Sequence, residues 1–103
     1  MKKSKTKLIP DQYYGCGTII KVVYFHDGIK ENQTCILANT FEEPYLFQVI
    51  SIDGYNAGSI EGYIKRQFDL KMLDITNCCT GLHLQNELYE RVFQNIESIY
   101  SVK

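Results

Sequence analysis

The 103-residue sequence lacks the features that mark several large protein classes. It has no long apolar run. After the basic start, the apolar pair Leu8-Ile9 is followed directly by Pro10-Asp11. A signal peptide needs a longer apolar stretch, so we expect a cytoplasmic protein that makes no contact with a membrane. Internal repeats and low-complexity stretches are also absent, which argues against a repeat architecture.

The cysteines are few and poorly spaced for metal binding. They are Cys16, Cys35, Cys78 and Cys79, with no C-x-x-C pair among them. The adjacent pair is an awkward arrangement for two ligands of one tetrahedral zinc, and adding His83 would require distant segments to converge. Disulfides rarely persist in a reducing cytoplasm. We therefore expect free thiols, no metal site and no cofactor.

Composition and charge indicate one globular domain. The hydrophobic fraction of 45% and the charged fraction of 22% are close to globular averages, and the length suits a single core. Four of the eleven basic residues lie in the first seven positions, which leaves seven basic against twelve acidic groups, a balance of −5. We expect a basic, flexible tail over residues 1–10 and one acidic domain over 11–103. Such a body repels nucleic acid and attracts basic protein surfaces.

Runs rich in β-branched and aromatic residues predict strands. They cover residues 18–25, 34–39 and 45–52, and a polar turn over 26–33 separates the first two. Pro44 precedes the third run, where its missing N–H does not disturb a ladder. The first two runs suit a hairpin, and all three predict the centre of an antiparallel sheet.

The segment after the third run begins with a turn over residues 53–58, where two glycines and an asparagine tolerate positive φ. We interpret residues 59–66 as a fourth strand, although their apolar positions also fit helical spacing. Residues 68–76 fit either a strand or a helix. The assignment of 59–76 thus stays open between the two.

The C-terminal part of the sequence predicts a helix from Leu82 to Lys103. Its apolar residues recur at spacings of four and three, no glycine or proline interrupts it, and Thr80 suits the N-cap. The apolar stripe consists of Leu84, Leu88, Val92, Ile96 and Ile99. The predicted fold is therefore α+β, an antiparallel sheet of about four strands with a C-terminal helix packed on one face.

A catalytic site would need a nucleophile, a base and an orienting group. The best trio is Cys16 with His26 and Asp27, but nothing in the sequence places the cysteine near a predicted turn that holds the other two. We therefore expect a binding protein and not an enzyme. A small enzyme or enzyme subunit that uses Cys16 or His26 is one alternative, and a homo-oligomeric structural module joined through the C-terminal helix is another.

Tyrosine is the most suggestive residue type, since the chain has eight tyrosines and no tryptophan. Tyrosine combines a large contact area with a hydroxyl and is enriched at protein interfaces. Several tyrosines lie in or beside turns next to acidic groups, a mixture that suits a basic partner. The candidate partner-binding residues are Tyr14, Glu42, Glu43, Tyr45, Asp53, Tyr55 and Asn56.

The turn Asp53-Gly54-Tyr55-Asn56-Ala57-Gly58 after a hydrophobic strand resembles a segment of small bacterial immunity proteins from contact-dependent growth inhibition systems. The resemblance covers residues 47–63, and the tryptophan-rich segment of some of these proteins is missing downstream. It implies an inhibitor in the cytoplasm that binds a cognate toxin domain, often a nuclease, and blocks its active site. The partner would then be a toxin protein with a basic surface and not nucleic acid itself.

Overall fold

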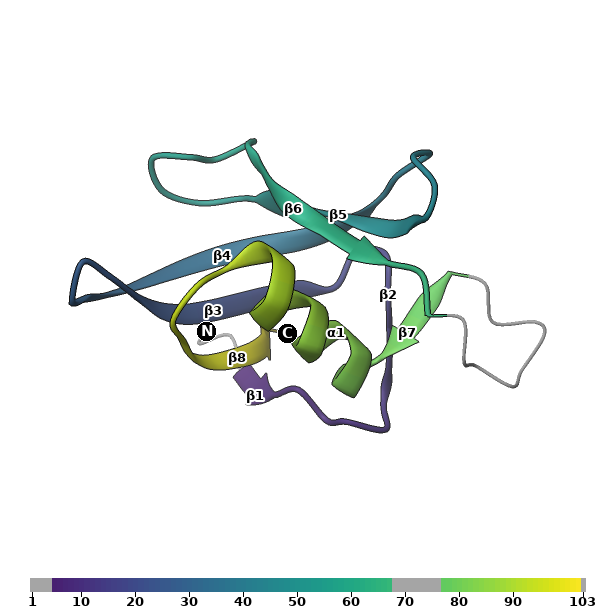
Figure 1. Ribbon diagram of the computed structural model, residues 1–103, viewed down its shortest axis with the longest axis horizontal. Coiled ribbons are helices and arrows are strands. Elements are labelled where there is room, and N and C mark those ends of the chain that lie inside the picture. The colour runs from purple at the N-terminus through teal and green to yellow at the C-terminus, as the bar shows by residue number, and fades with distance from the viewer. Residues whose placement is uncertain (1–4, 68–76, 103) are drawn as a thin grey trace.

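The computed structural model describes residues 5–67 and 77–102 and has an α+β fold. A six-stranded antiparallel sheet has the strand order β1-β8-β3-β4-β5-β6, and helical segments lie in front of it in Figure 1. Its strands are β1 (Lys5–Lys7), β8 (Ile96–Val102), β3 (Ile19–His26), β4 (Ile29–Asn39), β5 (Tyr45–Ser51) and β6 (Ile60–Lys65). The other elements are a small ladder of β2 (Tyr13–Gly15) and β7 (Cys78–Thr80), the helix α1 (Gly81–Glu87) and the π-helical turn η1 (Leu88–Val92).

The core lies between the helical segments and one face of the large sheet, here called the inner face. Ile20 pairs with Cys35 and Leu37 pairs with Val49, so the alternation of each strand places these side chains on the same side. The helical side contributes apolar residues at a spacing of four. The remaining core residues are Leu8, Tyr14, Val22, Leu46, Phe47, Ile64, Cys79, Leu84, Leu88, Phe93 and Ile99.

The strands predicted over 18–25, 34–39, 45–52 and 59–66 are confirmed as β3, β4, β5 and β6. The helix predicted from Leu82 to Lys103 is wrong beyond Val92, since the chain turns at Gln94 and Asn95 and returns as β8. Asn95 adopts φ 56°, a left-handed conformation that asparagine tolerates better than most residues. The β-branched residues that follow then fit the space beside β3, where each gains a ladder of backbone hydrogen bonds.

The sheet therefore has six strands instead of about four, and the two additional strands, β1 and β8, pair with each other. The flexible tail expected over 1–10 is wrong from Lys5 onward, because Lys5–Lys7 form β1 and Leu8 is buried in the core. A terminal segment that joins a sheet is held by its ladder. The open assignment over 68–76 lies outside the described residues.

The β3–β4 connection is much shorter than the predicted turn over 26–33. It consists of Asp27 and Gly28, with φ of 53° and 77°, a pattern typical of the two-residue turns of β-hairpins. Because neighbouring strands run antiparallel, this turn, the β5–β6 loop (52–59) and the η1–β8 turn (93–95) all lie at the same end of the sheet. We call it the hairpin end. The β4–β5 loop (40–44) lies at the opposite end.

Edge strand β6 is hydrogen-bonded to side chains of α1. The Lys65 N–H donates to Oε1 of Glu87 at 2.7 Å, and the Lys65 carbonyl oxygen lies 2.7 Å from Nε2 of His83. An edge strand leaves backbone groups without a neighbouring strand, and these two side chains supply partners at its last residue.

None of the helices among the described residues is long and apolar enough to cross a membrane.

Candidate protein-binding surface

The structure divides the predicted partner-binding residues between the two ends of β5. Asp53, Tyr55 and Asn56 lie in the β5–β6 loop at the hairpin end, whereas Glu42 and Glu43 lie in the β4–β5 loop. A strand rises about 3.3 Å per residue, so the length of β5 separates the two groups by roughly 20 Å. They form two surfaces and not one cluster.

Two of the predicted tyrosines are held within the fold. Tyr14 is only 5% exposed, and its hydroxyl accepts a hydrogen bond from the Ile9 N–H at 3.0 Å. Tyr45 is half-buried, and its ring centroid lies 5.0 Å from that of Tyr63. Tyr14 thus supports the core, and the ring of Tyr45 is already partly engaged.

The acidic pair in the β4–β5 loop is exposed. Glu43 forms an ion pair with Arg66 at 3.7 Å, and Glu42 follows a fully exposed Phe41. A single aromatic residue beside one uncompensated carboxylate makes a small surface. This end is therefore the weaker candidate of the two.

Asp53 anchors the β5–β6 loop to the neighbouring strand. Its Oδ1 accepts hydrogen bonds from Nε2 of the buried Gln33 at 2.9 Å and from the Thr34 N–H at 3.2 Å. Gln33 also donates to the Ser51 hydroxyl, which places the start of the loop against β4. Asp53 therefore has a structural role, and the predicted residues that this loop presents freely are Tyr55 and Asn56.

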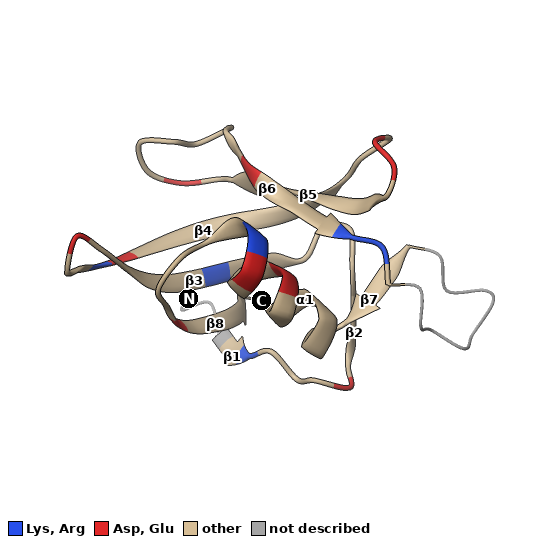
Figure 2. Ribbon diagram, viewed as in Figure 1, with Lys and Arg blue, Asp and Glu red and all other residues tan. Residues whose placement is uncertain are grey.

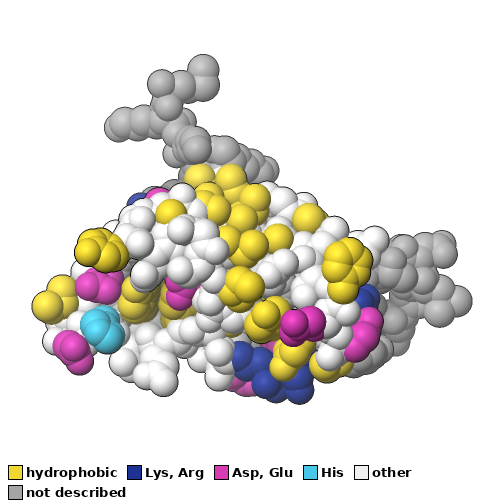
Figure 3. Space-filling view, turned by 90° about the horizontal axis from the view of Figure 1, so that it is seen from above, with side chains coloured by type: hydrophobic (Ala, Val, Ile, Leu, Met, Phe, Trp, Pro, Cys, Tyr) yellow, Lys and Arg dark blue, Asp and Glu magenta, His cyan; other side chains and the backbone are white. Residues whose placement is uncertain are grey.

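Exposed hydrophobic side chains gather at the hairpin end. The set consists of Phe25, Ile29, Ile52, Tyr55 and Ile60, of which Tyr55 is fully exposed. Figure 3 shows hydrophobic and acidic side chains interspersed toward one end of the visible face, around a histidine. Exposed apolar side chains among polar groups make this end a candidate for binding another protein.

Carboxylates surround this apolar surface. Asp27 lies in the hairpin turn, Glu31 follows it on β4, and Glu61 lies at the start of β6. Figure 2 shows acidic positions on the β3–β4 hairpin, on the β5–β6 loop and on β6. Lys30 is the neighbouring cation, and its Nζ forms an ion pair with Glu97 at 3.1 Å. The hairpin end is thus both apolar and acidic.

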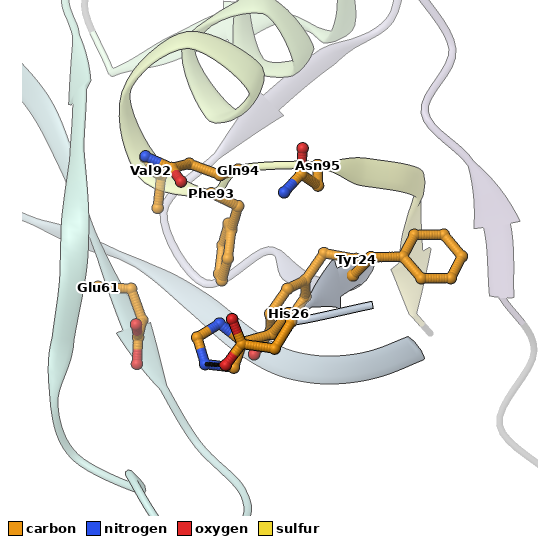
Figure 4. A pocket seen from close by; sticks show the side chains of 9 residues that line it. Tyr24, His26, Glu61, Val92, Phe93, Gln94 and Asn95 are labelled. Carbon is orange, nitrogen blue, oxygen red and sulfur yellow. Dashed lines mark ion pairs between the residues drawn. The ribbon is translucent and has the colours of Figure 1, made fainter. Parts of the chain in front are cut away.

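A hollow of about 390 Å³ opens between the β3–β4 hairpin, β6 and the η1–β8 turn, and we call it the hairpin pocket. Figure 4 shows Glu61 on one side of it and His26 on the other, with Phe93 reaching toward the space between them. The lining contains no lysine or arginine. It consists of Tyr24, Phe25, His26, Asp27, Glu61, Val92, Phe93, Gln94 and Asn95.

Aromatic rings and carboxylates meet in this pocket. The Tyr24 ring lies 5.4 Å from that of Phe93, centroid to centroid. Burial raises the pKa of Tyr24 above its ordinary value, and the nearby charges of Glu31 and Glu61, together with a hydrogen bond to the Glu31 side chain, raise it further. The lining thus combines the carboxylates of Asp27 and Glu61 with no lysine or arginine, which disfavours a further negative charge.

The structure does not bring together Cys16, His26 and Asp27, the best catalytic trio that the sequence offers. Cys16 is exposed in the turn before β3, whereas His26 and Asp27 lie at the far end of that strand, with Nε2 of His26 3.5 Å from Oδ2 of Asp27. The eight residues of β3 place the thiol roughly 25 Å from the imidazole. An attack by Cys16 activated by His26 is therefore excluded in this fold.

The four cysteines are free thiols, and Cys35 and Cys79 are buried in the core. Burial raises the pKa of both Cys35 and Cys79 to about 12, and it also raises that of Cys78. Within residues 5–67 and 77–102, no group of three or more His, Cys, Asp or Glu side chains is placed to hold a metal ion.

Sequence reasoning missed Phe25, Ile29 and Glu61 as members of the hairpin-end surface. A signal for the first two was present, because Asp27-Gly28 between apolar runs is typical of a two-residue hairpin turn. Such a turn would have placed both flanking side chains at an exposed tip. Glu61 had no comparable signal, since only the pairing of the strands places β6 across from the hairpin.

Comparison with models of known protein families, with curated proteins and with solved structures finds no match to this chain.

Proposed function

We propose that this protein binds a basic protein through its hairpin end and inhibits it, in the manner of an immunity protein that covers the active site of a toxin domain. The observation that carries the proposal is the hairpin pocket lined by the carboxylates of Asp27 and Glu61, at the end of the sheet that also carries the exposed Tyr55 and Ile29. Aromatic groups at the centre of an interface exclude water, and acidic groups at its rim steer a basic partner.

The resemblance to immunity proteins supports the same surface. Residues 47–63, which carry it, contain the whole β5–β6 loop and the start of β6. A toxin domain that is a nuclease has a basic active site, because it binds phosphates. Carboxylates of the hairpin end would occupy that site in place of the substrate, and such occlusion requires no catalytic residue.

The proposal is tested by comparing two exposed aromatic residues at opposite ends of the molecule. Tyr55 and Phe41 are both fully exposed in loops, so lysine at either position leaves the core untouched. Each variant and the unaltered protein is used as bait for affinity capture from the source cell. We expect a basic partner that the unaltered protein and Phe41→Lys retain and that Tyr55→Lys loses.

The captured partner is then purified, and its association rate is measured at increasing ionic strength. Steering between exposed charges is screened by salt, over a Debye length of about 8 Å at 0.15 M, so the rate should fall. Equal retention of the partner by Tyr55→Lys and Phe41→Lys would refute the assignment to the hairpin end. A rate that is independent of salt would remove the electrostatic part of the argument.

A further inference from the structure

The hairpin pocket has the chemistry of a receptor for one cationic side chain. We propose that it receives an arginine side chain from the protein partner, an inference that rests on the proposed function. Glu61 supplies the carboxylate, the rings of Tyr24 and Phe93 form apolar walls, and the side-chain amides of Gln94 and Asn95 lie at the rim.

The Glu61 carboxylate is available for this role. No hydrogen bond or ion pair joins it to any other described residue, whereas the carboxylate of Asp27 lies 3.5 Å from the His26 imidazole. Figure 4 shows Glu61 facing the rest of the lining from β6. An anion beside an aromatic pocket without a cation of its own favours a positively charged guest.

Arginine suits this lining better than lysine does. Its planar guanidinium donates two parallel hydrogen bonds to one carboxylate and stacks on an aromatic ring, whereas the ammonium group of lysine is a strongly hydrated point charge. The volume of about 390 Å³ lies near the lower end of the range for ligand sites, roughly 300–1,000 Å³. It therefore suits a single side chain better than a large cofactor.

The charges around the pocket strengthen this preference. Glu31 accepts a hydrogen bond from the Tyr24 hydroxyl, and the charge of Glu61 acts on the same hydroxyl through space. Burial raises the pKa of Tyr24, and both carboxylates raise it further. Arg91, next to Val92 in the chain, is paired with Glu87, and Lys30 is paired with Glu97.

The test uses the full chain and three small probes in an NMR titration of backbone amides. N-acetyl-arginine amide is compared with its citrulline counterpart, which has the same shape without the charge, and with its lysine counterpart. We expect arginine to bind with a dissociation constant of the order of millimolar and to shift the amides of residues 24–27, 61 and 92–95. Citrulline should produce no saturable shift, and lysine should bind more weakly than arginine.

A matched pair of variants assigns the charge that matters. Glu61→Gln keeps the shape of the side chain and should weaken arginine binding about fivefold or more, because the charge-assisted hydrogen bonds are lost. Glu90→Gln removes a charge from the exposed face of η1 and should change the binding by less than about twofold. Equal binding of arginine and citrulline, or an unchanged affinity in Glu61→Gln, would overturn the inference.

The probes also separate this inference from the proposed function. A protein partner that is lost in Tyr55→Lys, combined with no binding of the arginine probe, would leave the proposed function standing and remove the pocket as its receptor. Saturable arginine binding at the pocket without any Tyr55-dependent partner would keep the pocket and refute the proposed function.

Discussion

Replacing Glu87 with alanine should destabilise the fold, because this buried carboxylate holds the edge of the sheet to the helix. Oε1 accepts the Lys65 N–H at 2.7 Å, and Oε2 accepts Nε of Arg91 at 3.1 Å. The side chain is buried, so water cannot readily replace it as the acceptor for the β6 backbone. Truncation leaves that N–H without its partner and removes one of the two side-chain contacts that join α1 to Lys65, the other being that of His83.

The magnitude follows from the two bonds. A hydrogen bond to a charged group contributes about 1.5–3 kcal/mol, and an i,i+4 helix pair contributes about 0.2–0.5 kcal/mol. We therefore expect Glu87→Ala to lose about 2–3.5 kcal/mol of unfolding free energy. Glu87→Gln keeps a neutral acceptor for Lys65 and should lose about 1 kcal/mol. Arg91→Ala, which removes only the partly buried i,i+4 pair, should lose about 0.5 kcal/mol.

Urea unfolding followed by far-ultraviolet circular dichroism measures these differences without a tryptophan signal. Thermal unfolding provides a second readout, since 1 kcal/mol shifts Tm by roughly 4–8 °C in domains of about this size. Glu90→Ala on the exposed side of η1 serves as the control and should be close to neutral. If Glu87→Ala loses no more stability than Glu90→Ala, the edge of β6 does not depend on this carboxylate.

Three further predictions follow from the core. Gly81→Ala should lose about 1–3 kcal/mol of unfolding free energy in urea, because the added Cβ would lie 2.1 Å from the Ile9 carbonyl oxygen. A neutral effect would show that the backbone at Ile9 moves away without cost. Leu88→Asp should abolish cooperative unfolding, since Leu88 is fully buried and an unpaired buried charge costs several kcal/mol; an unchanged thermal transition would contradict its burial. The thiols of Cys35 and Cys79 have a pKa of about 12 in the folded protein, whereas in the unfolded chain they ionise near 9. Their contribution to the unfolding free energy is therefore complete below pH 9 and is lost as the pH rises toward 12. Urea unfolding between pH 8 and 10.5 should show the unfolding free energy falling above pH 9 by up to about 1.4 kcal/mol per pH unit for each thiol. Cys35→Ala should reduce this slope, and a stability that does not change with pH would contradict the prediction.

Local sequence determined the three strands β3, β4 and β5 and the start of the helix. The β-branched and aromatic runs over β3, β4 and β5 have a preference that their burial in the sheet then reinforces. Thr80 is the N-cap, as predicted, and its hydroxyl oxygen accepts from the His83 N–H at 3.2 Å. These features depend on residues that are close together in the chain, so the local residue pattern is sufficient to predict them.

The C-terminal segment shows where local pattern was insufficient. Leu84 and Leu88 do lie on a buried helical stripe, but Ile96 and Ile99 continue the same spacing by coincidence and belong to β8. A β-branched segment fits either a helix or a strand. It forms a strand here because β3 has a free side, and β8 pairs there, between β3 and β1. That information lies some seventy residues away in the chain.

The candidate site divides in the same way. Composition alone determined that the body is acidic and rich in tyrosine, and the turn chemistry of residues 53–58 placed Tyr55 and Asn56 in a loop. Tertiary structure alone decided that this loop shares one end of the sheet with the β3–β4 hairpin while Glu42 lies at the other. The antiparallel order of the strands sends successive connections to alternate ends, so which loops meet depends on strand pairing and not on distance along the chain.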